Sequence, residues 1–116
     1  MTIITDDFMR EMLQKTKNYC FVILKPGPNR NKPEAEKTIW EHGRRNFLLR
    51  GDGILSIVCP VAGGKELAGI GIFNASLEET KRIMDNDPAV KAGVLVYQAY
   101  SCIGFPGDSL PETTKK

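Results

Sequence analysis

Residues 54–73 read ILSIVCPVAGGKELAGIGIF, and this stretch decides the fold because it holds two β-strands in direct succession. Ile54 to Cys59 is a dense run of β-branched and other apolar residues, and Glu66 to Phe73 is a second one. Pro60 to Gly64, between them, has the composition of a loop. We therefore predict two neighbouring strands that pair antiparallel.

Helical patterns flank this pair on both sides. The segment from Pro33 to about Arg50 has helical spacing and ends at the helix stop Gly51-Asp-Gly53. Ser76-Leu-Glu-Glu79 matches a capping box, and the apolar stripe that follows it ends at Asp87-Pro88. We predict one helix before the strand pair and one after it.

Two further apolar runs complete the pattern, Tyr19 to Lys25 before the first helix and Gly93 to Tyr100 after the second. The order is then β-α-β-β-α-β, the arrangement of ferredoxin-like α+β folds, in which both helices cover one face of a four-stranded antiparallel sheet. Strand alternation sends apolar residues such as Phe21, Ile57 and Ile72 to both faces of that sheet. Because the uncovered face would be apolar, we expect two subunits to pack face to face as a homodimer.

The chain divides into three parts. We predict an N-terminal helical extension over residues 1–17, the ferredoxin-like domain over 18–103 and an irregular C-terminal tail over 104–116. The helix at residues 6–16 is expected to pack on the domain or on its dimer mate.

Composition excludes several classes of partner. The 16 basic and 14 acidic residues are spread along the chain and form no basic block, so we expect no nucleic-acid partner. No apolar stretch approaches the ~20 residues that span a bilayer, and the N-terminus lacks a signal-peptide pattern, so we expect no membrane partner. Cys20, Cys59 and Cys102 show no CxxC spacing, which favours free thiols and a cytoplasmic location and predicts no metal site.

His42, the single histidine, is the best candidate for chemistry. On a helical wheel it shares one narrow stripe with Ala35, Ile39, Asn46 and Leu49, so it faces the sheet or its edge, while a second set takes the opposite side: Lys37, Glu41, Arg44 and Arg45. Two interpretations stay open. His42 is either a buried core residue bonded to a backbone carbonyl or a general acid or base oriented by a carboxylate.

The carboxylate partner also has alternatives at this point. Asp87 is the best candidate, although it could simply end a helix before Pro88, and Asp85 suits the role equally well on sequence grounds. A catalytic role for Cys59 is weak, because small buried cysteines are usually inert apolar filler.

Four motifs resemble one known family: Leu24-Lys-Pro-Gly-Pro28, the helix-borne His42, Cys59-Pro60 and Asp87-Pro-Ala-Val-Lys-Ala-Gly93. Over roughly residues 18–100 the chain is similar to the YciI-like (YCII-related) proteins of the dimeric α+β barrel superfamily. The resemblance implies a ferredoxin-like fold, a barrel formed by two subunits with a cavity in each half, and an active-site pair at His42 and Asp87.

The function expected from these observations is a small-molecule enzyme of lyase, isomerase or hydrolase type, with an unknown substrate and neither metal nor organic cofactor. His42 and Asp87 would carry the proton transfer. The alternative is a non-catalytic metabolite-binding module, or an accessory subunit, with the same cavity.

Overall fold

The computed structural model describes residues 2–63 and 65–113, so Gly64 and the ends of the predicted extension and tail lie outside the described part. Its elements are, in order, α1 (Asp6–Gln14), β1 (Lys17–Pro26), α2 (Ala35–Gly51), β2 (Leu55–Pro60), β3 (Gly69–Phe73), α3 (Leu77–Asp85), α4 (Pro88–Lys91) and β4 (Leu95–Gly104). From β1 onward this is the predicted β-α-β-β-α-β order with one short helix, α4, added before the last strand.

The strands form one sheet in the order β2-β3-β1-β4, and every neighbouring pair is antiparallel. The two strands that are adjacent in sequence, β2 and β3, pair directly, with a register irregularity between Leu55 and Ile57. The first and last strands pair along their whole length, from Lys17 opposite Gly104 to Pro26 opposite Leu95. The α+β ferredoxin-like class predicted from the sequence is confirmed.

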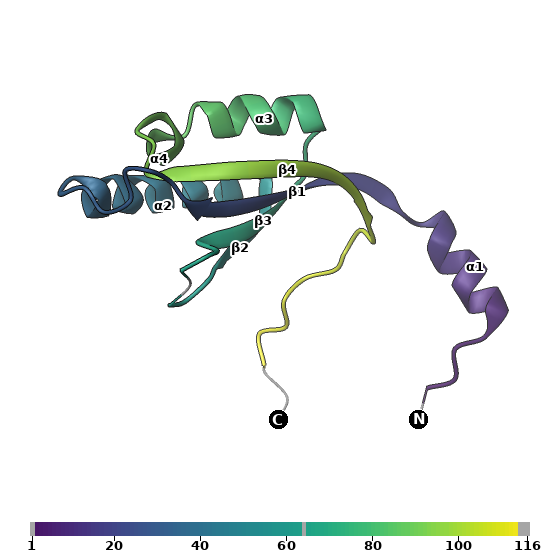
Figure 1. Ribbon diagram of the computed structural model, residues 1–116. Helices are drawn as coiled ribbons and strands as arrows, with labels where there is room; N and C mark the ends of the chain where they lie inside the picture. Colours follow the sequence, from purple (N-terminus) through teal and green to yellow (C-terminus); the bar gives the residue numbers. More distant parts are fainter. Residues whose placement is uncertain (1, 64, 114–116) are drawn as a thin grey trace.

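One face of the sheet carries the core. Helices α2, α3 and α4 lie on this side of the strands (Figure 1), where α2 packs against β2 and α3 packs against β4. Leu49 of α2 and Met84 of α3 meet side chains of three strands in a single cluster, whose strand members are Cys20, Val22, Leu55 and Phe73. The site described below lies between this helical layer and the sheet.

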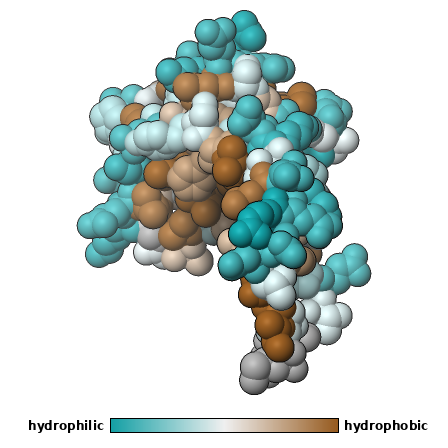
Figure 2. All heavy atoms as spheres, turned by 90° about the vertical axis from the view of Figure 1, so that its right-hand side faces the viewer, coloured by the Kyte–Doolittle hydropathy of each residue, from teal (hydrophilic) through white to brown (hydrophobic). Residues whose placement is uncertain are grey.

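The other face of the sheet has no helix over it. Phe21 and Ile23 alternate with the buried Cys20 and Val22 along β1 and therefore point to this open face, where both are half-buried. Tyr100, which pairs with Phe21 across β1 and β4, is 49% exposed. Figure 2 shows apolar surface gathered on the side of the molecule from which α1 projects.

The helix α1 stands apart from the domain. Thr5 caps its N-terminus, because the hydroxyl oxygen accepts a hydrogen bond of 3.1 Å from the backbone N–H of Phe8, and none of the residues of α1 is buried. Together with the C-terminal segment it extends the molecule, so the radius of gyration is 16.6 Å. A compact domain of this length would have about 13 Å. The expectation that α1 packs on its own domain is wrong, and packing on a second copy stays a prediction.

Several element ends differ from the expected ones. β3 begins at Gly69 rather than Glu66, because residues 65–68 belong to the connection from β2. β4 continues past Tyr100 to Gly104, since β1 extends back to Lys17 and offers it a partner. The expected stop of the second helix at Asp87 is also wrong, because α3 ends at Asp85 and Asp87 starts α4.

Cys20, Cys59 and Cys102 are all free, as predicted. Within the described residues, no helix has the length and apolar character needed to cross a bilayer. The cytoplasmic location stays a prediction.

Candidate active site

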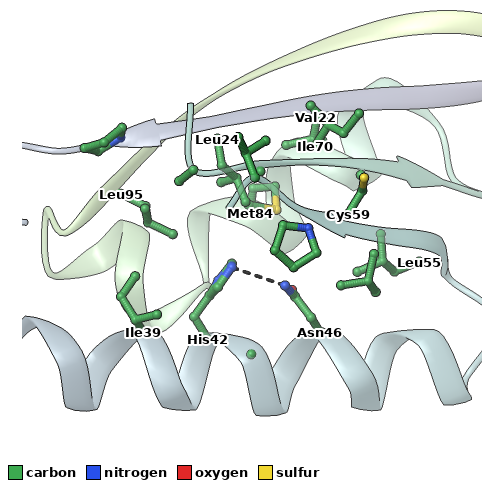
Figure 3. Close-up of a pocket in the computed structure, with 18 of the residues that line it drawn as sticks. Val22, Leu24, Ile39, His42, Asn46, Leu55, Cys59, Ile70, Met84 and Leu95 are labelled. Atoms are coloured by element: carbon green, nitrogen blue, oxygen red, sulfur yellow. Dashed lines mark hydrogen bonds between the residues drawn. The ribbon is translucent and has the colours of Figure 1, made fainter. Parts of the chain in front are cut away.

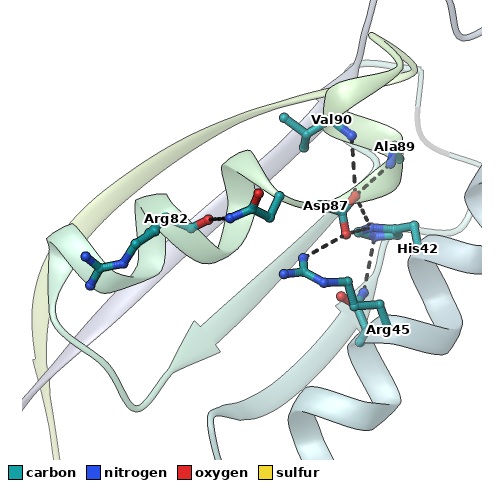
Figure 4. A network of polar contacts seen from close by, with 8 residues as sticks. His42, Arg45, Arg82, Asp87, Ala89 and Val90 are labelled. Carbon is teal, nitrogen blue, oxygen red and sulfur yellow. Dashed lines mark hydrogen bonds and ion pairs between the residues drawn. The ribbon is translucent and has the colours of Figure 1, made fainter.

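The two residues that the sequence singled out are in direct contact. His42 comes from the middle of α2 and Asp87 from the turn between α3 and α4, and their side chains meet as Figure 4 shows. The Nδ1 atom of His42 lies 2.8 Å from Oδ1 and 2.9 Å from Oδ2 of Asp87. His42 is 8% exposed and Asp87 only 1% exposed. The predicted proximity is thus observed, and the catalytic role of the pair stays a prediction.

Asp87 is fixed in place by the helix that it starts. As the N-cap of α4, its Oδ2 accepts hydrogen bonds from the backbone N–H groups of Ala89 at 2.9 Å and Val90 at 3.3 Å. The alternative partner, Asp85, faces another group, because its Oδ1 accepts a 2.7 Å hydrogen bond from the hydroxyl of Tyr97. Of the two candidate carboxylates, the structure therefore brings only Asp87 to His42.

Opposing effects act on the charge of Asp87. Burial is the largest and would raise the pKa of the carboxyl group, because the charged form is costly to desolvate. Three effects outweigh burial: the hydrogen bond from His42, the positive charge of His42 in its protonated form, and the hydrogen bonds from two backbone N–H groups. The pKa of Asp87 therefore lies below its ordinary value. Asp87 is consequently ionised at neutral pH.

The charge of Asp87 decides the tautomer of His42. An ionised carboxylate can only accept hydrogen bonds, so Nδ1 must carry the ring proton. In the neutral ring Nε2 is then a bare acceptor, and the side-chain Nδ2 of Asn46 donates to it at 3.1 Å. The alternative of a core histidine is correct in its burial and wrong in its backbone-carbonyl partner, because side chains occupy both ring nitrogens.

The position of the Arg45 side chain differs from the expected one. The helical wheel assigned it to the side of α2 opposite His42, but its Nη1 reaches to 3.5 Å from Oδ1 of Asp87 and its side chain is 24% exposed. A residue three positions after another lies on the same side of a helix, and the long arginine side chain covers the remaining angle. Arg45 therefore adds positive charge next to the buried carboxylate.

His42 and Asn46 also line a cavity between α2 and the sheet, shown in Figure 3. Its volume is about 440 Å³, within the range of sites for small molecules. Asp87 is not among the lining residues, so the ring of His42 separates it from the cavity. Most of the lining is apolar: Val22, Leu24, Ile39, Phe47, Leu55, Val58, Phe73, Met84 and Leu95.

The arrangement has the parts of a general base. One ring nitrogen bonds to a buried anion, and the other, which accepts a hydrogen bond from Asn46, lies beside a mostly apolar cavity. Within the described residues, no group of three or more His, Cys, Asp and Glu side chains comes together.

Sequence reasoning missed the contact between Arg45 and Asp87 and gave Asn46 no role. Their positions three and four residues after His42 were the available signal, because such residues are neighbours on a helix. A cavity, which the resemblance also implied, opens beside His42.

The comparisons with known proteins add little to this geometry. No family model and no curated protein matches the sequence. Among solved structures, the chain is similar to 5-chloro-2-hydroxyhydroquinone dehydrochlorinase (TftG) from Burkholderia phenoliruptrix AC1100, in a complex with 2,5-dihydroxybenzoquinone. The two are 19% identical with a TM-score of 0.45, and the match covers 73% of this chain and 90% of that one. The site is therefore interpreted from its own geometry.

Proposed function

We propose that this protein is a small-molecule enzyme of lyase, isomerase or hydrolase type in which His42 transfers a proton and Asp87 orients it. The proposal is carried by the different surroundings of the two ring nitrogens. Nδ1 faces a buried carboxylate at 2.8 Å, whereas Nε2 lies beside Asn46 on the wall of the cavity. A histidine kept only for packing has no need of a buried, ionised partner, which is costly to desolvate.

The proton transfer would run through Nε2. A substrate in the cavity gives its proton to the lone pair of Nε2, and the ring becomes an imidazolium ion. Asp87 stabilises this cation through Nδ1 without taking the proton, and it also prevents the ring from turning. The same group can return the proton to another atom of the substrate, which is how an isomerase or a lyase completes its cycle. This chemistry requires neither a metal nor an organic cofactor.

Turnover of a substrate panel by wild type and by two variants tests the proposal. The panel consists of small carboxylic acids, lactones and halogenated aromatic compounds. For any substrate that is converted, His42→Gln should lower turnover by about 10²–10⁴-fold, the usual contribution of a general acid or base. Asp87→Asn should lower it as well, because an amide at this position can donate to Nδ1 and reverse the tautomer.

The exposed Arg44→Gln on the outer side of α2 serves as the control and should leave turnover unchanged, since its side chain is 68% exposed. Unfolding curves of each variant separate a loss of activity from a loss of fold. Ligands that bind but are never converted, or equal turnover by His42→Gln and wild type, would favour the metabolite-binding module or the accessory subunit instead.

We also infer a relationship to the YciI-like proteins and a homodimer as the working unit. The support is the string from Asp87 to Gly93, which joins the candidate site to the start of β4, and the apolar open face of the sheet. Two such faces packed together would remove this surface from water.

A further inference from the structure

Asn46 is the second polar side chain next to the reactive nitrogen. It lies one turn after His42 on α2, is half-buried and lines the same cavity, and its Nδ2 is 3.1 Å from Nε2 (Figure 3). We propose that Asn46 first positions the base and then binds the oxygen anion that forms when the base takes a proton. This inference rests on the proposed role of His42 and adds the class of substrate to it.

The first half of the proposal follows from the tautomer. While Nε2 is a bare acceptor, the amide N–H of Asn46 donates to it and fixes the orientation of the ring. When Nε2 receives a proton it becomes a donor, and two N–H groups then face each other. The single lone pair of Nε2 cannot hold both protons, and the contact would turn from attractive to repulsive, so the amide of Asn46 must leave Nε2 before a substrate proton is transferred.

The second half follows from the charge that the transfer creates. The proton moves from the substrate to Nε2, and the electron pair of the broken C–H or O–H bond stays on the substrate and ends as a negative charge on oxygen. No other reactant is consumed. The amide N–H released from Nε2 is then free to donate to this oxygen, and donors placed where charge develops are the strongest means of stabilising such an anion.

The cavity lining fits an anion of this kind. Among the described residues that line it, no aspartate or glutamate occurs, whereas Arg30 supplies a cation. One N–H of the Arg30 guanidinium is engaged by Glu36 at 3.0 Å, which leaves other donors of the group unused. Because the rest of the lining is apolar, the substrate should be a small, mostly apolar molecule. Its acidic proton lies on oxygen or on a carbon next to a carbonyl group.

A phenol whose colour reports its ionisation tests this proposal, and 4-nitrophenol is the probe. At a pH where the free probe is mostly neutral, wild type should bind it as the coloured phenolate, with its proton on His42. Asn46→Leu removes the donor at similar size and should weaken binding of the phenolate by about 10- to 100-fold, the loss of one hydrogen bond to a charged group. Asn46→Asp should weaken it further by repulsion.

A second measurement does not depend on the affinity of the variants. Since His42 is the only histidine, its two ring nitrogens give one pair of ¹⁵N NMR signals. In wild type alone these signals should show a protonated Nδ1 and a bare Nε2, and addition of the probe should protonate both. The exposed Asn18→Leu, at the far end of β1, is the control and should behave as wild type.

The outcomes are distinct. Equal phenolate binding by Asn46→Leu and wild type, or binding of the probe by wild type in its neutral form only, would overturn the role of Asn46, as would an absence of binding. The proposed function of His42 would survive those results, because its test is the turnover of the substrate panel. Ionisation of the probe by His42→Gln would instead show that the proton goes elsewhere, and both proposals would then be abandoned.

Discussion

At the level of single residues, the electrostatics of the site depend on the buried carboxylate of Asp87. It is almost completely buried, yet it stays charged because His42 and two backbone N–H groups bond to it, and Arg45 lies nearby at 3.5 Å. Removal of any one of these partners leaves a buried charge less compensated, which is costly. The same contacts that prepare His42 for proton transfer therefore also stabilise the fold.

The lowered pKa of Asp87 makes stability depend on pH in a defined direction. In the unfolded chain the carboxyl group takes up a proton near its usual pKa of about 3.9, whereas the folded protein resists protonation until a lower pH. The contribution is therefore fully present above about pH 3.9 and is lost as the pH falls through the folded-state pKa. Urea unfolding of wild type at a series of acidic pH values should show this loss.

Asp87→Asn should decline less steeply over the same acidic range, because the variant has no such carboxyl group to titrate. Asp7→Asn, whose native side chain is 96% exposed, is the matched control and should follow wild type. Parallel curves for wild type and Asp87→Asn would mean that the pair does not contribute to acid stability.

Residue patterns predicted which side chains face inward but not how far each one reaches. The spacing of His42 with Ala35 and Leu49 placed it correctly on the buried side of α2. The same wheel failed for Arg45, because a wheel records the direction of the Cβ atom and ignores a long, flexible side chain. The choice between Asp85 and Asp87 needed the position of α3 relative to α2, which no local pattern contains.

At the level of elements, the loop after β1 and the turn before β4 are locked together. The backbone N–H of Gly27 donates to the carbonyl oxygen of Val94 at 2.8 Å, and that of Asn29 donates to Gly93 at 2.9 Å. The side chain of Asn29 adds a hydrogen bond of 2.7 Å to the carbonyl oxygen of Ala92. These three hydrogen bonds connect the end of β1 to the segment after α4, and thus to the helix that Asp87 begins.

Glycine-to-alanine substitutions at two positions test this contact between the loop after β1 and the turn before β4. A Cβ atom at Gly27 would collide with the carbonyl oxygen of Gly93, so Gly27→Ala should destabilise the protein by about 2–3 kcal/mol. Gly43→Ala, in the middle of α2, meets nothing within 4 Å and should instead stabilise it by about 0.5–1 kcal/mol, because alanine is the better helix residue. Thermal and urea unfolding give both values. The same sign for the two variants would contradict the proposed packing at Gly27.

The order of the larger elements could be predicted because each has its own sequence period. The short helix α4 could not be predicted in this way. With four residues, Pro88–Lys91, it is too brief to show any period. Its only local signs are Asp87 as a cap and Pro88 in the first turn, and the same two residues equally suggest the end of the preceding helix. The function of Asp87 depends on this distinction, since a cap is held rigidly whereas a frayed helix end is not.

At the scale of the whole molecule, two exposed apolar surfaces on the described part of the domain are candidates for an interface. The first is the open sheet face, with Val96 43% and Tyr100 49% exposed. The second lies on α2, where Trp40, Leu48 and Phe47, which also borders the cavity, are between 63% and 70% exposed. Because β1 and β4 supply the first surface along most of their length, it is the larger candidate for an interface.

We predict that two copies associate through the sheet face and that the dimer persists at micromolar concentration. A stable interface buries about 1,600 Å² in total, and burial of the open face with α1 against the second copy could supply such an area. Val96→Glu and Tyr100→Glu place a charge on this face at positions already exposed, so each should yield a folded monomer in sedimentation experiments. Leu48→Glu carries the same change on α2 and should remain dimeric. Because the site lies on the helical side of the sheet, the monomeric variants should keep the ¹⁵N signals of His42, and a monomer produced by Leu48→Glu alone would move the interface to α2.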